Sequence, residues 1–194
     1  MKSFTKVKSI VTPFDQVNVD TDQIVPKQFL KLIQKSGFGK YLFYNWRYDS
    51  NEQPISDFVL NDSKYQNSKI FVTRDNFGCG SSREHAIWAL QDFGFSVIIA
   101  PSFSDIFYSN CFKNGLLPIQ LDSKIVDSIM NSNSEIEVDL ESQTITTDFQ
   151  TISFEIDPHK KKVLLEGLDD ILLTLEYENK ITDFEKKSNV PSVL

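Results

Sequence analysis

The sequence predicts an α/β fold, with a mainly parallel sheet flanked by helices and a smaller antiparallel set of strands. In the middle of the chain, apolar segments of strand length alternate with segments of helix length. That rhythm is typical of parallel strands joined by right-handed crossovers. After Met130 the apolar residues recur with period two instead, as expected for antiparallel strands with one solvated face.

The first 65 residues predict few regular elements. The segments expected here, in chain order, are a strand over residues 7–14, a polar loop over residues 15–22, a helix over residues 27–36 and a long loop over residues 41–65. Pro26 favours the helix start, and Gly37 and Gly39 favour its end. Because four aromatic residues lie between Tyr41 and Trp46, we expect the long loop to be ordered and docked on the core.

The rest of the chain supplies most strands of the two sheets. Parallel strands are predicted over residues 69–73, 95–100 and 116–121, with helices over residues 83–93, 103–113 and 123–130. The segments with period two are residues 135–140, 144–146 and 151–156, and a helical pattern returns from Pro158 through Leu175. We expect residues 1–180 to form a single domain and residues 181–194 to be a loose C-terminal tail.

Composition argues against several classes of function. The formal net charge of −7 argues against nucleic-acid binding, which needs a basic face. Apolar runs such as Val97–Ala100 are too short to cross a bilayer, so we expect a cytoplasmic protein with no membrane partner. Two cysteines, Cys79 and Cys111, are too few for a disulfide framework or a metal cage. A four-iron cluster would need thiolates from a partner, so we expect no metal or cofactor bound by this chain.

The segment from Asn76 to Arg83 is predicted to carry the chemistry. Gly78 and Gly80 permit positive φ and a close approach of the backbone to a ligand. A helix is predicted directly after them, so free N–H groups and the positive end of its dipole would face a carboxylate or phosphate. Arg83 is one of only three arginines in the chain, and its guanidinium suits bidentate recognition of a carboxylate.

A second interpretation of the same residues is purely structural. Ser81 at the N-cap and Glu84 at the third helical position would form a capping box. The two roles conflict, because a Ser81 hydroxyl that caps the helix is unavailable to a ligand. The segment is neither a G-x-S-x-G nucleophile elbow nor a Walker loop or dinucleotide fingerprint. His85 is expected to pack or to support a neighbouring site residue.

These residues resemble the signature of the aconitase-type swivelling domain family, and within it the small subunits of bacterial isopropylmalate dehydratases. The resemblance is carried by Asp75 to Ala86 and extends to residues 18–26, 41–48, 100–108 and 114–119. It covers about residues 4–180 and implies a swivelling β/β/α domain.

The resemblance also implies an activity. The family interconverts 2- and 3-isopropylmalate in leucine biosynthesis, by removing water and adding it back through isopropylmaleate. A heterodimer or larger complex is implied, in which a large subunit holds a [4Fe-4S] cluster and the substrate is a small dicarboxylate. In this chain Ser81 would be the catalytic base, Arg83 would bind a substrate carboxylate and the Ser82 N–H would help to hold the alkoxide. The other residues expected at the substrate are Gly80, Arg47, Lys31 and Asp22.

Two alternatives stay open. In compact relatives of the family, a short run after the early loop selects the third group of the substrate. Here that run, residues 29–32, carries a cation at Lys31. The sequence is therefore also compatible with a sister hydro-lyase acting on methylmalate and citraconate, or on homoaconitate. The other alternative is a non-catalytic anion-binding module in which Ser81 is a plain helix cap.

Overall fold

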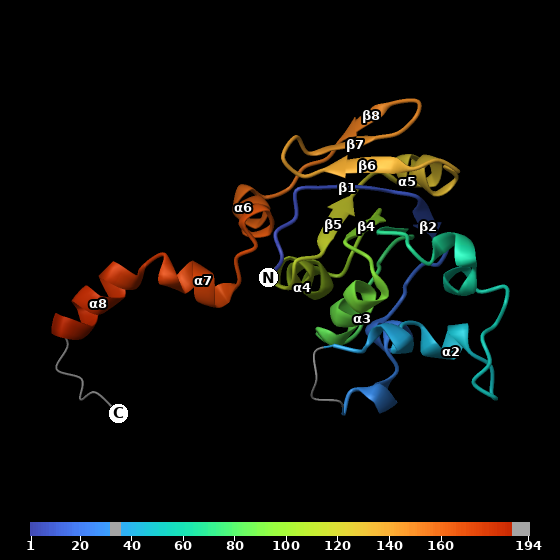
Figure 1. Ribbon diagram of the computed structural model, residues 1–194, viewed down its shortest axis with the longest axis horizontal. Coiled ribbons are helices and arrows are strands. Elements are labelled where there is room, and N and C mark those ends of the chain that lie inside the picture. Colours follow the sequence, from blue (N-terminus) through green and yellow to red (C-terminus); the bar gives the residue numbers. More distant parts are fainter. Residues whose placement is uncertain (32–35, 188–194) are drawn as a thin grey trace.

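Two four-stranded sheets form the framework of the protein. The computed structural model describes residues 1–31 and 36–187. One sheet is parallel, in the order β2-β3-β4-β5, and the other is antiparallel, in the order β1-β6-β7-β8 (Figure 1). The strands are β1 (Lys6–Ser9), β2 (Val11–Pro13), β3 (Ile70–Val72), β4 (Val97–Ala100), β5 (Leu117–Gln120), β6 (Ile136–Asp139), β7 (Thr144–Thr146) and β8 (Thr151–Ser153). The predicted α/β fold is confirmed, although the antiparallel sheet is as large as the parallel one because β1 joins it.

The parallel sheet is the middle layer of the fold. On one face, Ile70 and Ile99 pack with helix α5 (Ser123–Met130) and with the antiparallel sheet. On the other face, Phe71 and Ile98 pack with helices α3 (His85–Phe93) and α4 (Asp105–Asn114). Figure 1 shows the antiparallel sheet above this layer and α3 and α4 below it. Because both faces are covered, the parallel strands are almost continuous apolar runs, which is why the sequence predicted them well.

The prediction of one strand over residues 7–14 is wrong. β1 pairs antiparallel with β6, whereas β2 pairs parallel with β3, so the chain changes sheets between them. Two serine hydroxyls hold the break: Ser68 Oγ donates to the Ile10 carbonyl over 3.0 Å, and the Lys69 N–H donates to Ser9 Oγ over 2.9 Å. These bonds join residues about sixty positions apart, so the local apolar pattern does not contain the break.

Short helices occupy residues 20–65, where a helix and two loops were predicted. They are α1 (Thr21–Ile24), η1 (Lys27–Phe29), η2 (Gly39–Tyr41), α2 (Tyr44–Arg47), η3 (Val59–Asn61) and η4 (Ser63–Tyr65). The prediction of a helix over residues 27–36 is wrong in its described part, where only the 3-10 turn η1 forms; residues 32–35 lie outside the described residues. Pro26 does precede this turn, but none of the η1 side chains is fully buried, so the turn has no buried face along which a longer helix would pack.

The segment over residues 41–65 is ordered and docked, as predicted from its aromatic residues. The Phe43 side chain is fully buried, and its ring lies 4.6 Å from that of Phe14 and 5.9 Å from that of Phe71 on β3, centroid to centroid. Phe43 takes a left-handed φ of 50°, which turns its ring into the core immediately before α2. Aromatic packing onto the parallel sheet thus replaces regular secondary structure here.

Three helices follow β8. They are α6 (Pro158–Glu166), α7 (Asp170–Leu175) and α8 (Glu178–Lys187). Figure 1 shows α7 and α8 extending away from the two sheets. Residues 181–187, predicted as the start of a loose tail, are helical in α8, and residues 188–194 lie outside the described residues. Across the described ranges, no helix is long and apolar enough to cross a membrane.

Candidate functional site

The glycine turn predicted to carry the chemistry lies between the end of β3 and the start of α3. Gly78 has a φ of +75° and Gly80 a φ of +93°, so both use the left-handed region that glycine tolerates best. A Cβ on Gly78 would lie 2.2 Å from the Phe107 ring of α4. The turn therefore needs glycine for its backbone conformation and, at position 78, for its close packing as well.

The segment over residues 18–26 holds the turn from one side. The Gly78 N–H donates to the Val19 carbonyl over 2.8 Å, and the Thr21 N–H donates to the Cys79 carbonyl over 2.9 Å. The Thr21 hydroxyl accepts from the Ser81 N–H at 3.2 Å and donates to the Ser81 carbonyl at 3.1 Å. Because Thr21 is buried, this double contact fixes the backbone of Ser81 from inside the protein. Sequence reasoning missed Thr21, although it lies in the segment that carries the family resemblance.

The loop before α4 holds the turn from the other side. The Phe77 N–H donates to the Ser102 carbonyl, and the Ser104 N–H donates to the Phe77 carbonyl, each over 3.1 Å. The Ser104 hydroxyl donates to the Gly78 carbonyl over 2.6 Å and also caps α4. The turn is thus bonded to two segments far away in sequence, which makes it a rigid platform.

The capping-box prediction is wrong, and the Ser81 hydroxyl is free of the helix. α3 begins at His85, two residues later than predicted, and its N-cap Glu84 makes no side-chain cap. Ser81 therefore lies three positions before the N-cap, and its carbonyl accepts from Thr21 and from the Arg83 N–H, the latter at 2.8 Å. Within the described ranges its exposed hydroxyl has no hydrogen-bond partner.

The later helix start changes the electrostatics of the turn. The field of a helix dipole falls off within its first turn, so α3 contributes less at Gly80 and Ser81 than predicted. The backbone N–H groups of Gly80 and Ser82 meet no acceptor among the described residues. Anion binding at this turn therefore depends on these two donors and on a nearby side chain.

That side chain is Arg83. It forms an ion pair with Asp22 of α1, and Lys27 Nζ lies 3.2 Å from the other oxygen of the same carboxylate. The Arg83 and Asp22 side chains are partly exposed, so the pair is open to exchange with a substrate carboxylate. The charges of Arg83, Lys27 and Asp22 sum to +1, while Asp20 adds a negative charge close to Cys79. The structure thus brings Gly80, Ser81, Ser82, Arg83 and Asp22 together.

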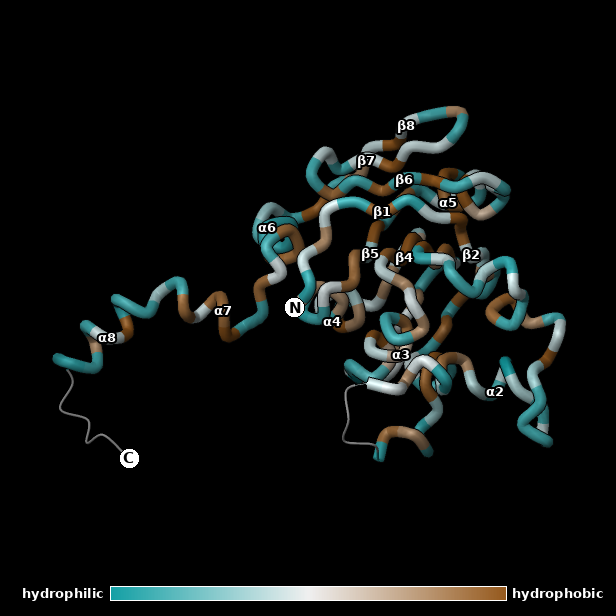
Figure 2. The backbone as a smooth tube through the Cα atoms, in the orientation of Figure 1, coloured by the Kyte–Doolittle hydropathy of each residue, from teal (hydrophilic) through white to brown (hydrophobic). Residues whose placement is uncertain are grey.

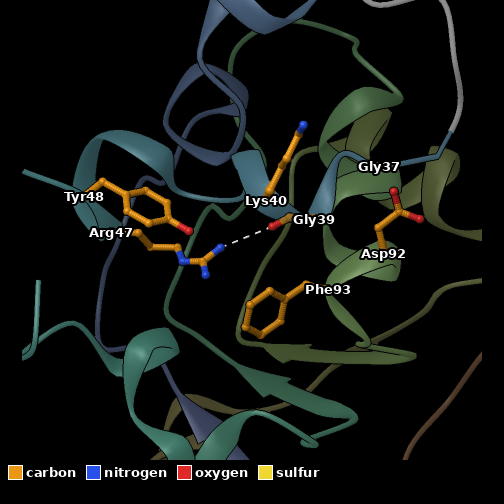
Figure 3. Close-up of a pocket in the computed structure, with 7 residues that line it drawn as sticks. All are labelled: Gly37, Gly39, Lys40, Arg47, Tyr48, Asp92 and Phe93. Atoms are coloured by element: carbon orange, nitrogen blue, oxygen red, sulfur yellow. Dashed lines mark hydrogen bonds between the residues drawn. The ribbon is translucent and has the colours of Figure 1, made fainter. Parts of the chain in front are cut away.

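Arg47 lies at the other end of α3. Its guanidinium is 5.0 Å from the ring centroid of Phe93, the last residue of α3, whereas Arg83 precedes the first. The two ends of this helix are about 12 Å apart. Arg47 donates to the Gly39 carbonyl over 3.2 Å and to Asn61, and it lines an open cavity of about 550 Å³ (Figure 3). Burial lowers the pKa of Arg47 from its ordinary value. No contact joins it to the turn among the described residues.

Lys31 is exposed at the edge of the described residues, next to residues 32–35. In the selector run over residues 29–32, Phe29 stacks on Tyr41 with 4.1 Å between ring centroids, while the fourth residue lies outside the described ranges. The structure therefore fixes the start of this run against Tyr41, in the aromatic segment over residues 41–65. It does not join Lys31 to the turn by any contact in the described part of the chain.

Cys79 and His85 do not form a nucleophile pair. Burial, together with the charge of Asp20, raises the pKa of the Cys79 thiol, which disfavours its reactive thiolate form. The His85 ring packs 4.7 Å from Trp88 and 5.2 Å from Phe38, so the prediction of a packing residue is confirmed. No group of three potential metal ligands occurs among the described residues.

Comparison with known proteins identifies the family. Over 195 residues the chain is 54% identical to the 3-isopropylmalate dehydratase small subunit of Ruthia magnifica, covering 96% of each chain. Over 200 residues it is 53% identical to the protein of the same name from Nitrosomonas eutropha, covering 95% of this chain and 94% of that one. The chain belongs to this family.

Family models and a solved structure agree with this assignment. The Aconitase C-terminal domain model matches residues 1–124, and the LeuD_N model matches residues 128–158. The crystal structure of 3-isopropylmalate dehydratase (leuD) from Methanocaldococcus jannaschii is similar, with a TM-score of 0.68 and 26% identity over 93% of this chain and 99% of that one. The predicted aconitase-type domain is confirmed.

Proposed function

We propose that this chain is the small subunit of a cytoplasmic hydro-lyase that interconverts 2- and 3-isopropylmalate through isopropylmaleate in leucine biosynthesis. The observation that carries the proposal is the Ser81 hydroxyl, free of the helix on a backbone fixed by Thr21 and beside Arg83. The high identity to small subunits of this name supports it. In this proposal the chain is active only together with a large subunit, in a heterodimer or larger complex.

Two side chains of the turn, those of Arg83 and Ser81, have distinct roles in the proposed reaction. Arg83 binds a substrate carboxylate by exchanging it for Asp22, and the carbon beside that carboxylate then lies next to Ser81. In dehydration, the Ser81 oxygen removes a proton from this carbon, and the C–H electron pair forms a carbon–carbon double bond as the bond to the hydroxyl on the neighbouring carbon breaks. The proton taken by Ser81 and the departing hydroxide together make up the water that is released. In hydration the steps reverse, and Ser81 returns the proton.

The main physical difficulty is the basicity of a serine alkoxide. It is accessible only where preorganised donors stabilise it, each contributing about 3 kcal/mol in a site that excludes water. The unoccupied N–H groups of Gly80 and Ser82 and the guanidinium of Arg83 are such donors. Since water must be excluded, the turn needs a covering subunit.

The [4Fe-4S] cluster of the family does not fit this chain. Cys111 is completely buried, Cys79 is partly covered, and the described residues hold no metal-ligand cluster. We therefore assign the cluster to the large subunit, where it supplies Lewis-acid chemistry at the substrate hydroxyl.

The test is hydration of isopropylmaleate by the purified chain with its large partner. Ser81→Ala is expected to lower kcat by about 10³-fold at saturating partner, the loss of a positioned base. Ser82→Ala is the matched control, because the proposed role of Ser82 uses only its backbone N–H; kcat stays within a few-fold. A Ser81→Ala rate equally close to wild type would remove Ser81 from the chemistry.

A sister hydro-lyase is the second candidate, favoured by the exposed cation Lys31 in the selector run. It differs only in the substrate's third group. Comparing kcat/KM for isopropylmaleate, citraconate and homoaconitate separates the three possible substrate specificities, and we expect isopropylmaleate to be preferred. Carboxylate binding without turnover of any of them would favour the non-catalytic module.

A further inference from the structure

Helices α7 and α8 carry apolar side chains that the rest of the described chain leaves uncovered. Figure 2 shows hydrophobic stretches along both helices beyond α6. The exposed fractions are 72% for Ile171, 51% for Leu175, 55% for Tyr177 and 69% for Phe184. Isolated large apolar residues on a surface are ordinary, but a run of them on two successive helices marks an interaction surface.

The spacing of these residues places them on stripes. Ile171 and Leu175 are four positions apart on α7. Tyr177, in the turn directly before α8, is followed at intervals of four and three by Ile181 and Phe184 on α8, which is the spacing of one helix face. Helices of six and ten residues are marginal in water unless an apolar face packs on something. Neither helix buries any side chain among the described residues, so the stripe needs a covering surface from outside the described part of the chain.

Size and charge indicate which molecule covers the stripe. The two helices span residues 170–187, fewer than the 20–30 residues a side of a stable independent interface, so they extend an interface made elsewhere. Between Asp169 and Lys187 there are six acidic and three basic residues, and the whole chain has a net charge of −7. A second copy would oppose acidic surfaces, whereas a partner with a basic rim would match them.

We propose that α7 and α8 form an arm that docks in an apolar, basic-rimmed groove of the large subunit. This proposal rests on the proposed function, which requires a large subunit over the Ser81 turn. The Ruthia magnifica small subunit aligns with 96% of this chain, which leaves at most about eight residues unmatched. The arm is therefore largely within the shared length of the small subunits rather than an addition peculiar to this chain.

The test compares two substitutions that each add one negative charge to α8. Phe184→Asp places it on the apolar stripe, whereas Asn179→Asp places it on the opposite face of the same helix. Both residues are exposed, so neither change disturbs the core. We expect Phe184→Asp to raise the Kd of the full chain for the large subunit at least about tenfold, as for an aromatic anchor, with Asn179→Asp within about twofold.

Two further measurements separate this proposal from others. At saturating large subunit, kcat for isopropylmaleate hydration stays at the wild-type value in Phe184→Asp; a loss of kcat there would overturn a purely docking role. Failure of the proposed function would instead appear as no turnover by the wild-type complex. Amide exchange in residues 170–187 slows when the large subunit is added. The proposed arm would be overturned if amide exchange in residues 170–187 did not change on adding the large subunit and Phe184→Asp left the Kd unchanged. It would also be overturned if the isolated chain formed dimers that Phe184→Asp dissociates.

Discussion

Arg83 and Arg47 lie at opposite ends of helix α3 and are held in opposite ways. Arg83 pairs with the partly exposed Asp22 beside a turn whose backbone is held by hydrogen bonds from Thr21 and Ser104. Arg47 is buried and donates to Gly39, Leu42 and Asn61, and these bonds hold together the segment over residues 39–61. The first arrangement fixes the backbone and leaves a charged side chain exchangeable; the second uses the side chain to fix the backbone. Only the first is suited to binding a substrate and releasing a product.

Among the changes that test this comparison of the two arginines, the largest effect is expected for Arg83→Ala. Losing the charge-assisted contact to a substrate carboxylate lowers kcat/KM by about 10²–10³-fold. Its partly exposed ion pair contributes little to folding, so the free energy of unfolding changes by less than about 1 kcal/mol. Steady-state kinetics of the complex and urea unfolding of the chain measure both. Arg74→Ala is the control, since Arg74 also pairs with carboxylates, those of Asp15 and Asp127. Equal losses of kcat/KM in both would contradict a specific site.

The second prediction is that substitution of Arg47 lowers stability and leaves turnover nearly unchanged, the opposite of what is expected for Arg83. Arg47→Met keeps the apolar stem but leaves the Leu42 carbonyl without its side-chain donor and the Gly39 carbonyl with the Leu42 N–H alone. We expect the free energy of unfolding to fall by about 2–3 kcal/mol, with kcat of the folded complex within a few-fold of wild type. Lys40→Met, on the rim of the same cavity, is the control and changes the unfolding free energy by about 0.5 kcal/mol or less. A stable Arg47→Met protein with a strongly raised KM would return Arg47 to the substrate site, where the sequence had placed it.

The third prediction tests whether the anchored backbone matters. Thr21→Val removes both hydrogen bonds to Ser81 while keeping the shape of the side chain. We expect kcat to fall about tenfold at an unchanged KM, because the base is less well positioned. Thr73→Val is the matched control, since the Thr73 hydroxyl is also buried and donates to one carbonyl, that of Gln16. Both variants lose about 1 kcal/mol of stability, and only Thr21→Val loses turnover.

The same contrast explains how much of the molecule the sequence could predict. The parallel strands β3, β4 and β5 were predicted because burial on both faces makes each a continuous apolar run. The break at Ile10 and the start of α3 at His85 were not, because hydrogen bonds from Ser68 and Thr21 decide them across about sixty residues. The glycines, Ser81 and Arg83 of the site were visible as residue types. The groups that fix them, Thr21 and Ser104, look like ordinary helix-start residues in the sequence.

Arg47 shows the converse problem. Scarcity of arginine and family resemblance both placed it at the substrate, since a sequence pattern does not reveal which donors a fold has already used. Its buried bonds within the loop supply that information. The prediction that Arg47 binds substrate is still open to the kinetic test above, and the structure gives that role no supporting contact in the described part of the chain.

The smallest effect concerns pH and arises where the turn meets α3. Burial against Phe38 and Trp88, together with the positive charge of Arg83, lowers the pKa of His85 below its ordinary 6.5, while Glu84 opposes the shift. A lowered pKa in the folded state means that the unfolded chain binds more protons in acid. The contribution of His85 to the stability of the fold is therefore complete above pH 6.5 and is lost as the pH falls through the folded-state pKa.

Urea unfolding at pH 5.5 and 7.5 measures this loss. The free energy of unfolding should differ less between the two pH values in His85→Gln than in wild type, and His159→Gln measures what any histidine-to-glutamine change does. The double variant His85→Gln/Arg83→Ala tests where Arg83 points when no substrate is bound. If Arg83 faces His85, the two substitutions change the pH dependence of the unfolding free energy non-additively.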